Sequence, residues 1–566
     1  MKILLIYPYF LEERLNAEEI AAVPIGLYYI GAFLKERGHD IEILNWHNVD
    51  KESGLIEKAL KHKRPDMIGL SVFHANRWGA VDIARIAKKL DPKVKVVFGG
   101  PGATFLWEHF LTHFPEIDFV VPGEGERSFA ALVDAVGQGH PAAGIKGIAY
   151  RASAKPVRTE DPPPIENPDE LPDPARYFTF EHVASSRGCP WNCTFCGSPR
   201  FWGRKVRFHS PAYFVDQLER LYRKGVTFFF FSDDTFALKE ARVIEICRRI
   251  IEKGLNITWV AISRVENVSE DMFYWMRKAG CIQISYGIES GSEEIRALLN
   301  KNLDARQIRR AFALTQRYGI LARAYFIYGC PRETDETIRE TLDLIGEIRP
   351  LSIIFYILDI FPGTALYREF QERTGASDDI WLKKMEDIMY WETDPDLSRE
   401  QVLAFGEKLR AGFYENLPRF AEALDLVGRV DLYPHHADFL SRLAMTFTHG
   451  DYAGIDAIPD KAKTASALHK HALRYHPEHR AFMGFGILMQ QAGDYEGSVG
   501  VLLDGIRAHP RSEALHICLA ISLMNLGRYR EALDHLMRFP RSAQAAGLKE
   551  TCHRALNAAG TPTATE

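Results

Sequence analysis

The sequence predicts an α/β protein in three parts: an N-terminal open parallel sheet of Rossmann-like type, a partial TIM-type (β/α)6 barrel, and a C-terminal region of helices alone. Two observations lead to this prediction. Short apolar runs alternate with amphipathic helical stretches over residues 1–150 and again up to about 370, a pattern typical of βα units. After about residue 375 the strand-like runs stop, and helical periodicity continues.

The first part, residues 1–150, is predicted from five apolar runs. The expected strands are 3–7, 41–45, 67–73, 94–98 and 119–122. Open parallel sheets bind ligands beyond the carboxyl ends of their strands. The glycine-rich segments 99–104 and 123–127 follow two of these strands, and glycine lets the backbone approach a large ligand closely. The same segments are also compatible with plain strand-to-helix turns.

A boundary is predicted after the first part. Seven prolines lie between residues 152 and 176 among many charged residues, which indicates an extended linker, 151–180, rather than a packed element. The barrel is predicted over 181–375. Its expected strands are 183–186, 227–232, 257–262, 282–287, 322–328 and 352–358. In such barrels the active residues gather at the carboxyl ends of the strands.

The C-terminal part is predicted as a helical connector, 376–430, a repeat region, 431–550, and a tail, 551–566, whose last ten residues read as disordered. Gly-Asp-Tyr at 493–495 recurs as Gly-Arg-Tyr at 527–529, and His-Pro at 476–477 recurs at 509–510. A period of 33 to 34 residues in helix-turn-helix units resembles tetratricopeptide repeats, which stack into a concave binding surface.

Composition excludes several classes of protein. Hydrophobic residues make up 46% and charged residues 26%, which is typical of globular chains. The 70 Lys and Arg against 75 Asp and Glu give a net charge of −5, so no basic field favours nucleic acid as a partner. The N-terminus begins with a strand-like run, and the sequence has no run of 18 apolar residues, so we expect a cytoplasmic protein with no membrane span.

Three of the eight cysteines form a compact motif. Cys189, Cys193 and Cys196 give the pattern Cys-x3-Cys-x2-Cys directly after the first expected barrel strand. Soft thiolates at this spacing suit a metal site, and three ligands leave one position open for chemistry. The alternatives are a zinc site with a distant fourth ligand and accidental clustering.

The cysteine motif, its position after the first expected barrel strand and the downstream segments 286–291 and 361–367 together resemble those of the radical S-adenosylmethionine (radical SAM) enzymes. The resemblance implies that the three cysteines hold a [4Fe-4S] cluster whose fourth iron is chelated by SAM. It also implies that reduction of the cluster, by a partner such as flavodoxin or ferredoxin, cleaves SAM to a 5'-deoxyadenosyl radical that abstracts hydrogen from a substrate.

The same resemblance implies the SAM contacts. Phe195 matches the aromatic position near the adenine, while Glu289 and Ser290 match the residues that bind the ribose and polar groups. Arg264 and Arg323 are candidates for the SAM carboxylate, because guanidinium suits bidentate recognition. Each arginine is equally compatible with a structural ion pair.

Three further residues are candidates with open roles. Asp233 and Asp234 end the second expected barrel strand and either orient cluster or substrate or cap the next helix. Cys330 is expected at a strand end facing the reaction centre, where a thiol could bind metal or donate hydrogen, although a small buried side chain is the favoured interpretation. Two residues further on, Arg332 replaces a glycine that the family usually has.

An open α/β domain before such a barrel resembles the cobalamin-dependent subfamily. The resemblance implies a corrinoid over the strand ends. The implied contacts are Ser71, Gly99, Gly100, Pro101, Gly123 and Glu124. Many cobalamin proteins supply an axial histidine from Asp-x-His-x-x-Gly after the first strand, but residues 7–11 read Tyr-Pro-Tyr-Phe-Leu. His74 follows another strand, and it is either an alternative ligand of cobalt or a histidine of the loop. A domain that has lost cobalamin is the other alternative.

These observations predict a cobalamin-dependent radical SAM enzyme. By resemblance its reaction is methyl transfer from SAM through methylcobalamin to an unactivated carbon or a phosphinate phosphorus. A cyclase like the anaerobic magnesium-protoporphyrin ester cyclases, and a repeat-based scaffold with a vestigial barrel, are the alternatives. We expect a small-molecule substrate or one bound to a carrier or peptide, and a protein partner is a further possibility at the repeats.

Overall fold

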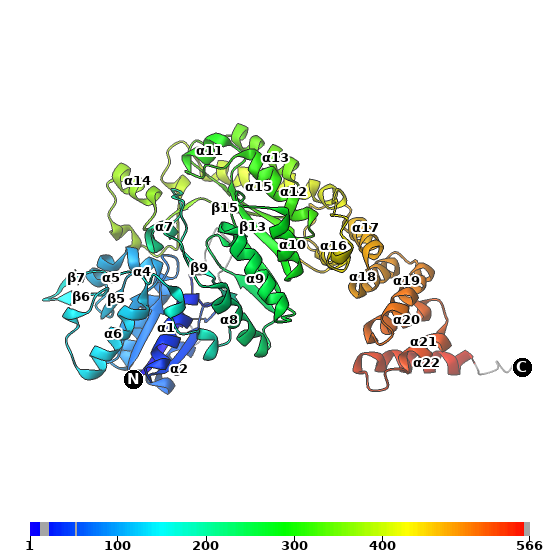
Figure 1. The fold of residues 1–566 in the computed structure, drawn as a ribbon, viewed down its shortest axis with the longest axis horizontal. Helices are drawn as coiled ribbons and strands as arrows, with labels where there is room; N and C mark the ends of the chain where they lie inside the picture. Colours follow the sequence, from blue (N-terminus) through cyan, green and yellow to red (C-terminus); the bar gives the residue numbers. More distant parts are fainter. Residues whose placement is uncertain (12–21, 51–53, 560–566) are drawn as a thin grey trace, which may run out of the picture. The chain divides into compact units, whose positions relative to one another are not determined.

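The computed structural model describes residues 1–11, 22–50 and 54–559 (Figure 1). These residues form two compact units. The first comprises the described residues of 1–311, 323–345 and 353–409, and the second comprises those of 312–322, 346–352 and 410–559. The first part of the predicted tail, 551–559, is the end of a helix, and residues 560–566 lie outside the described residues.

The N-terminal sheet has seven strands in the order β2-β1-β3-β4-β5-β6-β7. The first five strands are parallel, as predicted, and they are β1 Lys2–Tyr7, β2 Asp40–Asn45, β3 Met67–Ser71, β4 Lys95–Gly99 and β5 Phe119–Val121. An antiparallel hairpin, β6 Ala149–Ala152 and β7 Lys155–Arg158, then extends the sheet. The sheet therefore continues past the predicted boundary at 150, because Pro156 is tolerated in an edge strand.

Both faces of this sheet are buried. Along β1, Ile3 and Leu5 belong to one hydrophobic core, while Leu4 and Ile6 belong to another, since successive side chains of a strand point to opposite faces. Helices of this domain also contribute to these cores (Figure 1). They are α1 Ile25–Glu36, α2 Leu55–Lys63, α3 Arg77–Leu90, α4 Pro101–Phe105, α5 Trp107–His113 and α6 Gly125–Gln138.

The proline-rich segment is packed, which corrects the prediction of an extended linker. Ile165 and Leu171 are buried against Tyr29 of α1. The buried carboxylate of Asp173 accepts hydrogen bonds from Gln217 Nε2 at 2.9 Å and Arg220 Nη1 at 2.6 Å. Proline content indicated the absence of regular structure, but apolar and acidic residues between the prolines find partners on two neighbouring helices.

The second sheet has six strands in the order β8-β11-β12-β13-β14-β15, which agrees with the predicted partial barrel. The strands are β8 His182–Val183, β11 Phe228–Phe231, β12 Thr258–Ser263, β13 Cys281–Glu289, β14 Leu321–Tyr328 and β15 Ser352–Ile357. Between them lie α7 Ser198–Trp202, α8 Pro211–Arg223, α9 Glu240–Glu252, α10 Glu270–Lys278, α11 Glu293–Leu298, α12 Ala305–Arg317 and α13 Asp335–Ile348. A short pair, β9 Ser186–Arg187 and β10 Arg207–Phe208, flanks the predicted cysteine motif.

Residues after the last barrel strand return to the N-terminal domain. They form β16 Asp359–Ile360, α14 Ala365–Thr374, the 3-10 helix η6 Asp378–Leu382, β17 Ile388–Met389 and the start of α15 Arg399–Glu422. Trp381 of η6 is fully buried in the same hydrophobic core as Trp78 of α3 and Phe110 of α5. The segment is therefore part of the first unit.

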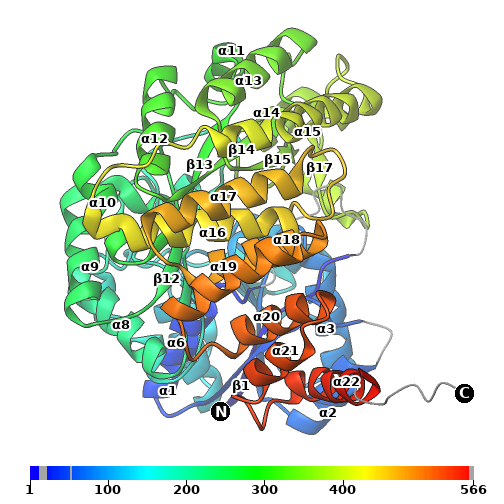
Figure 2. The same ribbon diagram turned by 90° about the vertical axis from the view of Figure 1, so that its right-hand side faces the viewer.

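The second unit is helical, and its consecutive helices pack against one another (Figure 2). They are α16 Tyr433–Thr448, α17 Lys461–Tyr475, α18 His479–Gln491, α19 Tyr495–Ala508, α20 Glu513–Asn525, α21 Tyr529–Leu536 and α22 Ala543–Ala559. The recurring glycines, Gly493 and Gly527, have φ of +78° and +74° and follow the C-cap residues of α18 and α20, a position where a left-handed residue commonly ends a helix. The tetratricopeptide-like character stays a prediction.

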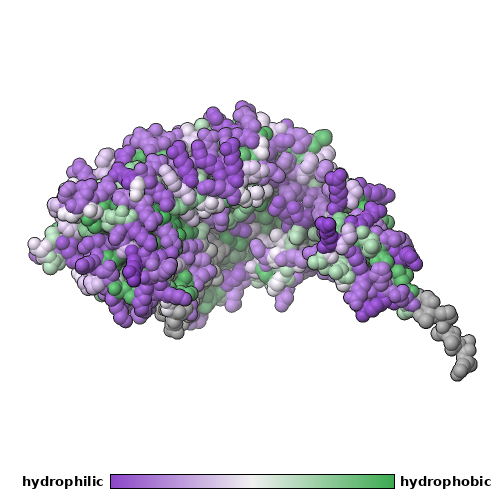
Figure 3. Space-filling model, turned by 90° about the horizontal axis from the view of Figure 1, so that it is seen from below, coloured by the Kyte–Doolittle hydropathy of each residue, from purple (hydrophilic) through white to green (hydrophobic). Residues whose placement is uncertain are grey.

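On the face shown in Figure 3, hydrophilic residues predominate and hydrophobic residues form small patches. Among the described residues, no helix combines the length and the apolar character that crossing a bilayer requires.

Candidate functional site

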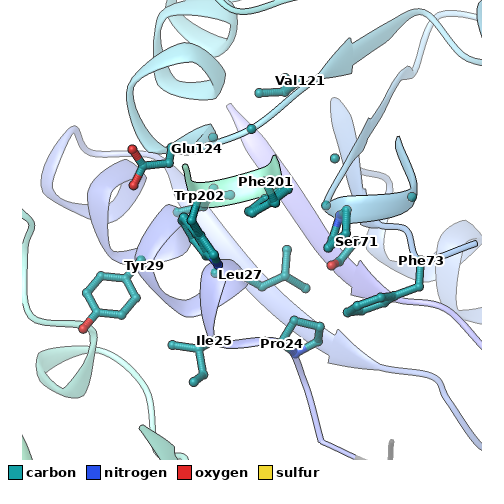
Figure 4. Close-up of a pocket in the computed structure, with 18 of the residues that line it drawn as sticks. Pro24, Ile25, Leu27, Tyr29, Ser71, Phe73, Val121, Glu124, Phe201 and Trp202 are labelled. Carbon is teal, nitrogen blue, oxygen red and sulfur yellow. The ribbon is translucent and has the colours of Figure 1, made fainter. Parts of the chain in front are cut away.

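A cavity of about 510 Å³ lies beyond the carboxyl ends of the N-terminal strands. Its floor is formed by the start of α1 and by the residues that follow β3, β4 and β5, which is where parallel sheets of this kind bind ligands. In Figure 4, Glu124 and Tyr29 lie on one side and Ser71 and Phe73 on the opposite side, with Trp202 of α7 between them. The volume is within the usual range of small-molecule and cofactor sites.

Glycines leave this cavity open for a broad ligand. A Cβ atom at Gly26 or Gly123 would meet nothing within 4 Å, so side chains there would stand in the cavity itself. Gly100 has a φ of +90°, a conformation that L side chains rarely adopt, and a Cβ there would lie 3.0 Å from the carbonyl oxygen of Val72. The floor of the cavity is glycine backbone without side chains, and its wall is mainly apolar, which fits a corrinoid.

All six positions implied as corrinoid contacts line this one cavity. They are Ser71, Gly99, Gly100, Pro101, Gly123 and Glu124. The structure therefore brings together residues that are 53 positions apart in the sequence, and their contacts with a corrinoid stay a prediction.

His74 also lines the cavity, and its ring is held on two sides. Its Nε2 lies 3.2 Å from Asp387 Oδ1 and 3.8 Å from Asp359 Oδ2, and the ring stacks on Phe361 with centroids 4.9 Å apart. Burial alone would lower the pKa of His74, but the two neighbouring carboxylates outweigh burial and raise it. Nε2 is thus engaged by carboxylates of the segment that follows the barrel.

A buried ion network joins the cavity wall to the strand that precedes the cysteines. Glu124 accepts from Arg187 Nη1 at 2.8 Å and from Arg207 Nη1 at 2.6 Å, and Arg187 Nη2 donates to Glu126 at 2.6 Å. Burial favours a raised pKa for Glu124, but the two guanidinium groups lower it overall. Glu124 therefore belongs to a structural contact between the first domain and the barrel as well as to the cavity.

The three cysteines lie on an irregular loop between β9 and α7. Gly188 starts it with a φ of +100°, and the loop is tied to neighbours through Thr194, whose N–H donates to the carbonyl of Leu299 at 3.0 Å. None of the three thiols is in a disulfide, and all three are partly exposed. Burial raises the pKa of Cys196 to about 12, so iron must displace the thiol protons on binding. Three soft donors on one loop fit the predicted cluster.

Arg264 lies beside the cysteine loop. Its guanidinium covers the ring of Trp191 at 4.2 Å from the centroid, and its Nη1 is 3.9 Å from Cys193 Sγ. Glu266 accepts from Arg264 Nε at 2.9 Å and from Nη2 at 2.7 Å. Arg264 therefore forms an ion pair with Glu266, as one of its two interpretations predicted. It also places a positive charge next to Cys193, one of the expected iron ligands.

At the end of β13, Glu289 is paired with Lys301, with Nζ 2.7 Å from Oε1 and both side chains buried. Glu289 has a φ of +70°, a strained conformation of a kind that gathers at functional sites. The hydroxyl of Ser290 lies 3.3 Å from that of Thr341 and accepts from the N–H of Ser292 at 3.1 Å. Ser290 thus shapes the turn after the strand.

The two other implied SAM contacts, Arg323 and Phe195, lie on different segments: Arg323 is in β14 and Phe195 is in the cysteine loop. Burial alternates along β14, and half-buried Arg323 lies on the face opposite to buried Ala322 and Ala324. Phe195 packs against the hydrophobic core next to the cysteines. Neither role is tested by these positions.

The paired aspartates separate into two roles. Asp233 is buried and accepts from the N–H of Ser185 at 3.1 Å and from the hydroxyls of Ser185 and Ser186. Asp234 lines the cavity, and burial raises its pKa, with Asp233 adding to the effect. Asp233 therefore holds the cysteine strand, while Asp234 faces the cavity.

Cys330 is fully buried in the hydrophobic core, and its Sγ lies 3.7 Å from the carbonyl oxygen of Ile327. It thus packs as the small buried side chain that the sequence favoured. Arg332 has a φ of +59°, which explains why a glycine is usual at this position.

Sequence reasoning missed the network of Arg187, Arg207 and Glu126. Arg187 stands two residues before Cys189, and this proximity was the available signal. The partners of these side chains lie on other elements, so no local pattern could identify them.

Comparison with known proteins gives consistent results. Residues 183–345 match the model of the radical SAM superfamily, and residues 21–133 match that of the B12 binding domain. The chain is 36% identical over 380 residues to "Uncharacterized methyltransferase PH0819" of Pyrococcus horikoshii, covering 65% of this chain and 82% of that protein. It is 30% identical over 400 residues to the anaerobic magnesium-protoporphyrin IX monomethyl ester cyclase of Rubrivivax gelatinosus, covering 67% and 71%.

Among solved structures, the chain is similar in fold to the radical S-adenosylmethionine methyltransferase TsrM from Kitasatospora setae, described with cobalamin and a [4Fe-4S] cluster bound. The TM-score is 0.60 at 17% identity, and the match covers 84% of this chain and all of the other.

Proposed function

Because the chain belongs to the radical SAM enzymes that carry a B12-binding domain, with a [4Fe-4S] cluster, SAM and cobalamin as cofactors, we propose that it is a methyltransferase. The methyl group of SAM is transferred to an unactivated carbon or a phosphinate phosphorus. Similarity to the Pyrococcus horikoshii protein, whose name describes a methyltransferase, supports this proposal.

One observation carries the proposal: a single cavity is lined both by the strand ends of the first sheet and by residues next to the cysteines. Gly99 and Gly123 line it from the sheet, and Gly197 and Asp234 line it from the barrel side. A group held over the sheet is therefore adjacent to the end of the cysteine loop at Gly197.

The chain's own residues hold and shield this centre. The three cysteines bind the iron, and Arg264 keeps a positive charge 3.9 Å from the sulfur of Cys193. The pair of Glu289 and Lys301 supplies buried polar groups at the carboxyl end of β13. When bound, the cluster supplies reductive SAM cleavage and cobalamin supplies methyl-carrier chemistry. Arg187 fixes the two sides of the cavity to each other through Glu124 and Glu126.

The test measures both products of SAM in the full chain, loaded anaerobically with cluster and cobalamin and reduced chemically. Methyl loss from SAM gives S-adenosylhomocysteine, and radical cleavage gives 5'-deoxyadenosine, so mass spectrometry separates the two reactions without knowledge of the acceptor. We expect S-adenosylhomocysteine in an amount stoichiometric with bound cobalamin and none without cobalamin.

Gly26→Trp sharpens this test. Gly26 lies in α1 at an ordinary helical φ with open cavity space at its Cβ, so the indole should fill the corrinoid position without straining the backbone. We expect S-adenosylhomocysteine to fall at least tenfold while 5'-deoxyadenosine persists. Gly144→Trp, at an exposed glycine outside the cavity with equally open space, is the matched control. Equal S-adenosylhomocysteine with and without cobalamin would contradict the proposal.

The second candidate is a cyclase or other oxidative reaction, favoured by the 30% identity to the magnesium-protoporphyrin ester cyclase. It predicts 5'-deoxyadenosine with no S-adenosylhomocysteine in the same assay. A scaffold with a vestigial barrel predicts neither product.

We further propose that a flavodoxin or ferredoxin supplies electrons and that the helical unit binds a carrier-linked or peptide-linked substrate or a protein partner. Deletion after α15, with 5'-deoxyadenosine formation as the readout, would separate a binding role of the helices from a role in barrel stability.

A further inference from the structure

A second group of metal-binding side chains lies away from the cysteines. His109 and His113 are four residues apart on α5, which places them on one helix face, and Asp379 of η6 lies opposite them. His113 Nε2 is 2.9 Å and His109 Nδ1 is 3.9 Å from Asp379 Oδ1, and the three ligand atoms lie within 4.8 Å of one another.

His109 is the unusual member of this group. Its side chain is only 2% exposed, and neither ring nitrogen has a hydrogen-bond partner. The ring packs among aromatic side chains, with centroids 5.9 Å from Phe110 and 6.0 Å from Phe114. Buried polar groups in folded proteins are almost always bonded, so a buried imidazole whose Nδ1 faces a carboxylate and a second imidazole requires an explanation.

We propose that His109, His113 and Asp379 bind one divalent cation of the zinc type. Zinc bonds to histidine and carboxylate ligands are about 2.0–2.2 Å long, so tetrahedral ligand atoms lie about 3.3 Å apart. The two distances to Asp379 lie on either side of this value, so small side-chain rotations complete the site.

The donor set selects the class of metal. Two imidazoles and one carboxylate suit zinc and its neighbours cobalt and nickel, whereas magnesium and calcium prefer oxygen ligands throughout. Three protein ligands leave a fourth position for water. This site is distinct in its donors from the all-thiolate motif, and it uses none of the residues that hold the cluster.

By binding Asp379 and the two histidines together, the cation attaches the segment that follows the barrel to α5. Arg77 of α3 already holds this segment, donating to the carbonyl oxygens of Trp381 at 3.1 Å, Lys383 at 3.0 Å and Met385 at 2.6 Å. At its far end the segment carries Asp387, which holds His74 at the cavity wall. Metal binding at Asp379 therefore fixes the near end of a segment that contributes to the wall of the cofactor cavity.

The test uses the full chain with cluster and cobalamin in place, so that the cysteines are occupied by iron. After dialysis against zinc, elemental analysis should give one zinc per chain. His113→Gln and Asp379→Asn should each lose that zinc or weaken its binding at least tenfold, with iron and cobalt contents unchanged. Glu108→Gln, which removes an exposed carboxylate from the same helix outside the group, should retain it.

A second measurement needs no variant. Zinc should protect His113 from diethyl pyrocarbonate at least tenfold, whereas exposed His140 on another element should react equally with and without zinc. Absence of the extra zinc in the parent, or no protection of His113, overturns the proposal. So does zinc that survives both substitutions but is lost in His74→Gln, since that result assigns it to His74, Asp359 and Asp387.

Discussion

Replacing Glu124 by glutamine tests the ion network that joins the N-terminal domain to the cysteine strand. The carboxylate bridges Arg187 and Arg207, with nitrogen–oxygen distances of 2.8 and 2.6 Å, and it also accepts from the N–H of Ile165 at 3.1 Å. Glutamine keeps the size of the side chain and one acceptor oxygen. It removes the negative charge and places an N–H group against the guanidinium groups.

The expected loss of stability follows from the partners that remain. Removing one member of a buried ion pair costs about 3–5 kcal/mol, because the other charge stays buried without compensation. Arg187 still has Glu126, and Arg207 still donates to the carbonyl of Ile165 at 2.8 Å. We therefore expect the lower end, about 3 kcal/mol of unfolding free energy for the first unit.

The pH dependence has a defined sign. The two arginines hold the pKa of Glu124 below its usual value of 4.5 in the folded chain. The stabilisation is therefore fully present above the unfolded pKa and is lost as the pH falls through the folded pKa. The difference in unfolding free energy between parent and variant should be constant near neutral pH and shrink in acid below 4.5.

Urea unfolding followed by circular dichroism measures this difference. Glu170→Gln is the matched control, because Glu170 pairs with Arg127 at 3.1 Å on the surface, where an ion pair contributes about 0–1 kcal/mol. If Glu124→Gln unfolds at the same urea concentration as the control, the network does not join the two domains energetically, and the reasoning fails.

Two other substitutions have equally direct outcomes. Cys193→Ala should abolish iron binding and 5'-deoxyadenosine formation, whereas Cys518→Ala in the helical unit should change neither; iron retained in the first variant would refute the ligand assignment. Arg332→Gly should stabilise the chain by about 0.5–1 kcal/mol in urea unfolding, because the left-handed φ of +59° strains any residue with a Cβ and the arginine side chain is 73% exposed. Arg339→Gly, in the exposed face of α13, should destabilise by about 1 kcal/mol, so the two glycines should act with opposite signs.

The sequence could predict the features that depend on neighbours along the chain. Apolar runs that alternate with amphipathic helical stretches predicted the parallel strands of both sheets, because a strand that is buried on both faces consists almost entirely of apolar residues. The spacing of Cys189, Cys193 and Cys196 predicted a metal site, since three ligands within eight residues can reach one metal whatever the remaining fold. The glycine that the family usually has at position 332 was a local signal too, because Arg332 has a left-handed φ of +59°, which favours glycine.

Only the tertiary structure decided which distant groups meet. Prolines predicted a linker, yet Asp173 and Ile165 are buried, because helices from two domains supply their partners. Arg264 and Cys193 are 71 positions apart, and the fold places Arg264 Nη1 3.9 Å from Cys193 Sγ. His109 and Asp379 are 270 positions apart and carry no shared pattern. Sequence thus determined the parallel strands and the cysteine motif through local patterns, whereas burial and charge pairing depend on contacts made only when the chain folds.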